Sequence, residues 1–218
     1  MNDKLKARIF QATHVTPSPT RRASHVQVWL VMLSSIVAAL ALFFAFDGAH
    51  HGLGRPPWFY AACTLAWSAV AALSMWGAFS RGSSALGRPR SLLLAIAFGT
   101  PAILFTLMFA FAVVFPEVTV IHPERIGLRC LGLTLAAAAF PLLGLTFVRR
   151  ESDPVHPVTT GAALGAACGA SAGVMVEMWC PVATPLHVAV GHVLPIVLLG
   201  VFGAILGARV LRMRARPT

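Results

Sequence analysis

Six long apolar stretches divide this 218-residue chain, and they limit what it can fold into. Each stretch is close to the ~20 apolar residues that a helix needs to cross the ~30 Å hydrocarbon core of a membrane. The stretches lack the polar positions of a water-soluble helix and the alternation of a lipid-facing barrel strand. The predicted spans are residues 27–46, 57–79, 91–115, 127–148, 158–179 and 186–208.

The sequence therefore predicts an all-α polytopic membrane protein, a single bundle of six transmembrane helices. Residues 1–26 form a polar N-terminal tail, and residues 209–218 form a basic C-terminal tail. The loops are too short to hold a separate soluble domain. The first 26 residues lack the apolar core of a cleavable signal, so the first span is expected to remain in the protein.

Positive charges alternate between the two sides of the predicted bundle. Of the 17 Lys and Arg residues, only three lie in the first, third and fifth loops. An excess of Lys and Arg marks cytoplasmic segments, so both termini are predicted to be cytoplasmic. This pattern, with attraction to anionic membrane lipid, explains the net charge of +10, and no direct nucleic-acid binding is expected. The 14 residues on the cytoplasmic side are Lys4, Lys6, Arg8, Arg21, Arg22, Arg81, Arg88, Arg90, Arg149, Arg150, Arg209, Arg212, Arg214 and Arg216.

Two of the four cysteines lie at the predicted outer boundary, together with two histidines. Cys130 begins the fourth span, Cys180 ends the fifth, and His187 and His192 begin the sixth. Thiols on the oxidising side can form a disulfide, become oxidised or bind a soft metal, and all three interpretations remain open. A metal is the weaker one, because the spacing matches no compact zinc signature. Haem would need facing histidines on separate helices, whereas His187 and His192 are expected on different faces of one helix. No cofactor is therefore predicted.

Ionisable residues are almost missing from the predicted spans. Glu177 is in the last turn of the fifth span, and we expect its side chain to reach the interface. Without an acidic or basic relay at mid-depth, an ion-coupled transporter is disfavoured, and a small transporter or channel is kept as the alternative function. Residues 169–173 match the hydrolase pattern G-x-S-x-G, but that pattern requires a strand, turn and helix, so no enzyme is predicted.

The fifth span carries a ladder of glycines, Gly161, Gly165, Gly169 and Gly173, each four residues apart. On a helix they line one face, where a neighbouring backbone can approach closely. The ladder predicts helix packing, within the chain or in a homodimer. The sixth span has a similar patch of glycines, so these two spans are expected to pack together.

The N-terminal tail is the longest cytoplasmic segment. A short helix is predicted through about His14, with Leu5 and Ile9 on one side and Arg8 among the charges around them. A proline-containing spacer then leads to Arg21 and Arg22. The tail either only sets the topology or docks to a soluble partner and folds on binding.

These features together resemble the NrsF-type family of six-span anti-sigma factors of the bacterial inner membrane. The chain is also similar to the light-responsive six-span anti-sigma regulators of myxobacteria. The resemblance follows the order of Cys130, Arg149-Arg150, the glycine ladder, Cys180-Pro181, His187 and His192.

The resemblance implies that the chain sequesters an extracytoplasmic-function sigma factor and releases it on stress. It also implies that Cys130 and Cys180 respond to the signal, which can be a metal, an oxidant or light-generated singlet oxygen. In this interpretation Leu5, Arg8, Ile9, Arg21 and Arg22 contact the sigma factor.

Overall fold

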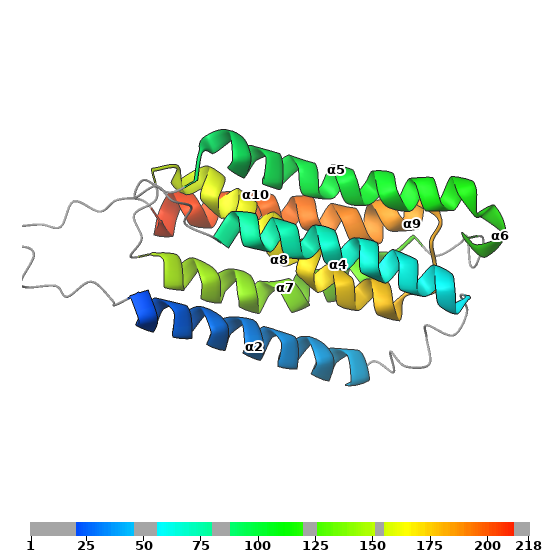
Figure 1. Cartoon of the computed structure of the whole chain (residues 1–218), viewed down its shortest axis with the longest axis horizontal. Helices are drawn as coiled ribbons and strands as arrows, with labels where there is room; N and C mark the ends of the chain where they lie inside the picture. The colour runs from blue at the N-terminus through cyan, green and yellow to red at the C-terminus, as the bar shows by residue number, and fades with distance from the viewer. Residues whose placement is uncertain (1–20, 46–55, 80–87, 120–125, 151–154, 212–218) are drawn as a thin grey trace, which may run out of the picture.

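The computed structural model describes residues 21–45, 56–79, 88–119, 126–150 and 155–211, and six of its helical segments are long and apolar enough to cross a membrane (Figure 1). The described residues form helices and no strands, which confirms the all-α, six-span prediction. The predicted span limits match these segments closely. The helices are α2 (Arg21–Ala45), α4 (Pro57–Phe79), α5 (Arg90–Val114), α6 (Pro116–Thr119), α7 (Leu128–Arg149), α8 (Pro157–Trp179), α9 (Pro185–Val188), the π-helical turn η2 (Ala189–Val193) and α10 (Leu194–Val210).

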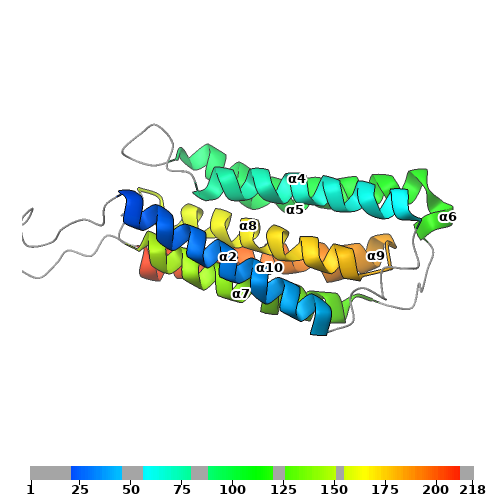
Figure 2. The ribbon, with the colours of Figure 1, turned by 60° about the horizontal axis from the view of Figure 1, so that its bottom comes forward.

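The long helices are arranged around α8. In Figure 2, α4 and α5 lie on one side of α8, and α2, α7 and α10 lie on the other. Helix α8 contacts α10, α4, α5, α7 and α2, and it is buried over most of its length. Helix α2 packs mainly on α7, and many of its large apolar side chains are exposed.

The central position of α8 follows from its small residues. A Cβ atom at Gly161 would overlap the carbonyl oxygen of Gly203, and one at Gly165 would overlap that of Leu199. Gly169 also faces α10, whereas Gly173 lies against the ring of Trp67 on α4. The glycine ladder is thus used for packing within the chain, and its face is not free for a homodimer.

The two ends of the bundle carry different residues. Helix α5 begins with Arg90, α7 ends with Arg149, and Arg209 is in the last turn of α10. These helix ends lie at the same end of the bundle, and we call it the arginine end (Figure 1). The guanidinium Nη1 of Arg149 donates a hydrogen bond of 2.8 Å to the carbonyl of Ala78, so α7 and α4 are joined there. The opposite end holds α6 and α9, and we call it the cysteine end (Figure 1).

Part of the predicted partner-binding segment lies outside the described residues. This applies to Leu5, Arg8 and Ile9, and therefore to the short helix predicted through His14. Arg21 and Arg22 are the first two residues of α2, so the helix begins before the apolar span that starts at Val26.

Candidate functional site: a buried cysteine and histidine cluster

Four side chains meet at the cysteine end and form a compact cluster. They are Cys130, Cys180, His187 and His192, and one ligand atom from each lies within 4.8 Å of all the others. All four are buried, and the four cysteines of the chain form no disulfide bond in the structure. The Nε2 atom of His187 is 3.5 Å from Sγ of Cys130 and 3.1 Å from Sγ of Cys180.

The position of Cys130 depends on a close approach of two glycines. Gly127 precedes α7 and has a φ of 95°, a conformation that side chains disfavour. A Cβ there would be 2.9 Å from the Cα of Gly191 in η2, and a Cβ at Gly191 would be 3.1 Å from that of Cys130. The start of α7 therefore lies directly on the π-helical turn, and no spacing within one segment predicts this contact.

The two histidines share one side of their helix, contrary to the sequence prediction. On a regular α-helix, residues five apart point about 140° away from each other. In η2, however, the backbone N–H of Leu194 donates to the carbonyl of Ala189, five residues back. This wider turn places residues five apart nearly in line, and the rings of His187 and His192 have centroids 5.5 Å apart.

A proline supplies a physical reason for the wider turn. Pro195 is the second residue of α10, and it has no N–H for the carbonyl of Gly191, four residues earlier. Its ring would also collide with that carbonyl in a regular α-helix. A π-helical turn just before a proline relieves this clash. Residues on either side of the turn then no longer follow the period of an α-helix.

Glu177 lies beside the cluster and does not extend to the interface as predicted. Its side chain is buried, and Oε2 is 3.3 Å from Nδ1 of His192, which is itself fully buried. That distance is within ion-pair range, although the angles do not give His192 a hydrogen bond at either ring nitrogen among the described residues. A carboxylate in an apolar segment requires such a partner, because burial of an unpaired charge is costly.

The surroundings favour the thiolate form of Cys180, which lies between two spans. A hydrogen bond from Cys130 lowers the pKa of Cys180 below its ordinary value, burial opposes this effect, and the ring of His187 supports it. The guanidinium of Arg129 lies 4.6 Å from the centre of the ring of Trp179, the residue that precedes Cys180 in the chain.

The donor set fits a soft divalent metal ion. Tetrahedral zinc with two thiolates and two imidazoles requires metal–ligand distances of about 2.0–2.3 Å, and hence ligand atoms about 3.3–3.8 Å apart. The cluster needs only a small contraction to reach this geometry. Cys180, His187 and His192 lie in one segment whose spacing matches no compact zinc signature, whereas the fourth donor, Cys130, comes from α7.

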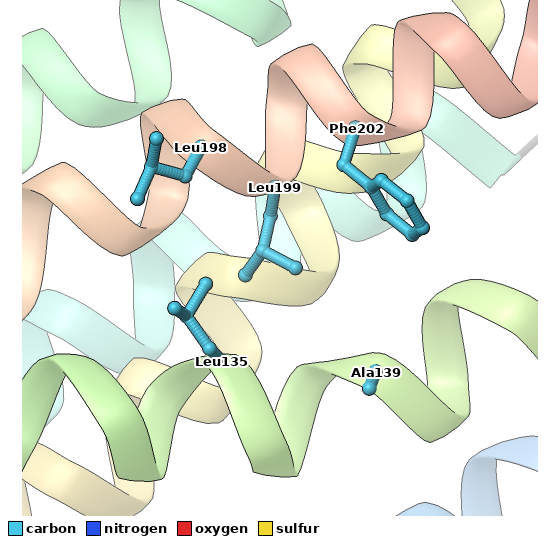
Figure 3. A pocket seen from close by; sticks show the side chains of 5 residues that line it. All are labelled: Leu135, Ala139, Leu198, Leu199 and Phe202. Carbon is cyan, nitrogen blue, oxygen red and sulfur yellow. The ribbon is translucent and has the colours of Figure 1, made fainter.

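The other residues that the sequence singled out lie away from the cysteine and histidine cluster. Cys63 and Cys168 are buried in apolar clusters along the bundle. The hydroxyl of Ser171 donates to the carbonyl of Ala167 within α8, so G-x-S-x-G is here part of a helix. A groove of about 260 Å³ between α7 and α10 is lined by apolar side chains alone and offers no polar route (Figure 3). Its lining residues are Leu135, Ala139, Leu198, Leu199 and Phe202.

The fold and the cluster define a multi-pass membrane protein with a metal-type donor set buried at one end of its bundle. The chain belongs to the family NrsF, negative regulator of sigma F, whose model matches residues 12–213. No curated protein and no solved structure matches the chain.

The family match confirms the resemblance found in the sequence. Membership identifies the chain as a negative regulator of a sigma factor, and it implies a regulatory role for the protein instead of an enzymatic one. It also favours this function over the alternative of a small transporter or channel.

Proposed function

We propose that the chain is an inner-membrane anti-sigma factor that holds an extracytoplasmic-function sigma factor through its cytoplasmic N-terminal tail. A thiophilic divalent metal ion that binds Cys130, Cys180, His187 and His192 releases the sigma factor. The observation that carries the proposal is the set of four buried donor atoms within 4.8 Å of one another, at the end opposite the arginines. Family membership supports the sigma factor as partner.

The charge of the donor set supports a divalent cation over a monovalent one. Two thiolates neutralise a divalent ion and leave the two imidazoles uncharged. With the buried carboxylate of Glu177 counted as well, a divalent ion leaves one net negative charge and a monovalent ion leaves two, and uncompensated buried charge is costly. Two thiolates with two imidazoles also prefer soft or borderline metals over magnesium or calcium.

The separation of the two ends supports a sensor that acts at a distance. The positive-inside rule supports a cytoplasmic arginine end, on the side of the tail, and a cluster at the outer side. The exposed apolar side chains of α2, α5 and α10 then face membrane lipid. Helix α8 supports transmission between the ends, because it contributes Glu177 at one end and contacts the other long helices along its length.

The partner is tested by co-purification from cells that express the full chain. A sigma factor, identified by mass spectrometry, should be retained by the intact protein and lost by a variant that lacks residues 2–20. The variant must still be found in the membrane fraction. If the intact protein retains no sigma factor, the proposal is wrong.

The signal is tested on the purified complex in detergent. Zn²⁺ or Cd²⁺ should release the sigma factor from the wild type, and Cys130→Ser and Cys180→Ser should each abolish release. Cys63→Ser is the matched control, because this thiol is buried away from the cluster, and its release should be normal. If an oxidant releases the sigma factor and neither metal does, the signal is thiol oxidation and not a metal ion.

A further inference from the structure

The buried carboxylate of Glu177 has a position that packing alone does not require. Its side chain is enclosed at the end of α8, within a segment apolar enough to cross a membrane. Its Oε2 atom is 3.3 Å from Nδ1 of His192. His192 is therefore the neighbour through which this acidic group can act on the cluster.

The ring of His192 is also packed against an aromatic side chain. The indole of Trp67 packs against it edge-on, with ring centroids 5.8 Å apart and an interplanar angle of 69°. Trp67 is itself fixed, since its Nε1–H donates a hydrogen bond of 2.9 Å to the carbonyl of Ala170. The carboxylate of Glu177 thus lies beside Nδ1 of a packed ring, and neither ring nitrogen has a hydrogen bond among the described residues.

An imidazole carries its two nitrogens on opposite edges, and the group beside one decides which nitrogen binds a metal. Ligand histidines commonly donate their second N–H to a carboxylate, which fixes the tautomer and makes the metal-binding nitrogen more basic. The carboxylate of Glu177 can accept a hydrogen bond, and it lies close enough to Nδ1 of His192 for this role. The unpartnered Nε2 atom of His192 is then the ligand atom.

We propose that Glu177 is a positioning residue that accepts the Nδ1–H of His192 and presents Nε2 to the metal held by Cys130, Cys180 and His187. This inference rests on the proposed metal-dependent function. It adds a residue that is not a ligand yet controls the affinity of the site.

The test uses Co²⁺, whose visible absorption reports tetrahedral coordination, on the purified full-length protein. Glu177→Leu keeps the approximate size but removes the acceptor, and it should weaken Co²⁺ binding about 10- to 100-fold. Glu177→Gln keeps an acceptor oxygen and should retain most of the affinity. Glu117→Leu controls for loss of a carboxylate at the same end, because Glu117 is exposed on α6.

A double-mutant cycle separates positioning from a purely structural effect. In a His192→Ala background, Glu177→Leu should cause no further loss of affinity and should leave the Co²⁺ spectrum unchanged. An equal loss in both backgrounds, or no loss in the wild-type background, would overturn the role of Glu177 while the metal site stands. Lack of Co²⁺ binding by the wild type would overturn both proposals.

Discussion

At the scale of single residues, two glycines control how closely the cysteine from α7 approaches the histidines. Gly127 and Gly191 touch through their backbones, and both lie next to a ligand of the candidate metal site. Any side chain at either position would push Cys130 outward. The distance between the donor atoms thus depends on the absence of a side chain at these two positions.

Gly191→Ala should weaken metal binding without removing a ligand. Its Cβ would be 3.0 Å from the carbonyl oxygen of Gly127 and 3.1 Å from the Cβ of Cys130, so Cys130 must move by a few tenths of an ångström. We expect about tenfold weaker Co²⁺ binding, or about 1.4 kcal/mol. Gly132→Ala on α7 is the control, because a Cβ there meets no atom within 4 Å. Equal affinities for the two variants would contradict this account.

The sequence predicted which cysteines and histidines would share one end, because consecutive spans run in opposite directions. It did not predict the pairing of Glu177 with His192, since a carboxylate near a span end can equally extend to the interface. Gly127 and Gly191 were also missed. Gly191 carries a usable signal, since it lies four residues before Pro195, where a distorted turn is expected.

At the scale of elements, the turn η2 sets the relation between the two histidines. A π-helical turn corresponds to one residue inserted into an α-helix. Deletion of Val190 should therefore restore α-helical geometry with His187 and His192 four residues apart, still on one face. Because a regular helix restores the clash with Pro195, the deletion is combined with Pro195→Ala. We expect a folded protein that binds Co²⁺ within about tenfold of the wild type, measured by the same titration. Complete loss of binding in a folded deletion variant would show that the turn itself is required.

The contact between α8 and α10 predicts a stability difference between two matched glycine substitutions. Gly165→Ala would place a Cβ onto the carbonyl of Leu199, so the helices must separate, at a cost of about 1–3 kcal/mol. Gly132→Ala has open space and should instead gain up to about 1 kcal/mol from helix propensity. Thermal unfolding in detergent measures both. A Gly165→Ala protein as stable as the wild type would contradict the close backbone contact.

The existence of the elements was predictable, because a run of about 20 apolar residues has few alternatives in a membrane. The pairing of α8 with α10 also followed from their glycines. The division of the last span into α9, η2 and α10 did not follow from periodicity, because the expected 100° per residue assumes an unbroken α-helix.

At the scale of the whole molecule, the arginine end and the cysteine end should lie on opposite sides of the membrane. Alkaline phosphatase needs an oxidising compartment to form its disulfides. A fusion after Thr119 should therefore be active, and one after Arg150 should be inactive. The reverse pattern would place the cluster in the cytoplasm and remove the argument for an outward-facing sensor.

The order in which the helices are made has a consequence for assembly in the cell. Helix α8 is the fifth of the six spans to leave the ribosome, yet it is the one on which α4, α5, α7 and α10 all pack. Among the described residues, the main contacts between the earlier spans are the pairs α4–α5 and α2–α7, so these spans lack most of their final contacts until α8 is made. Chains that stop before Pro157 should thus remain loosely associated and be degraded, so only a completed chain would restrain its partner.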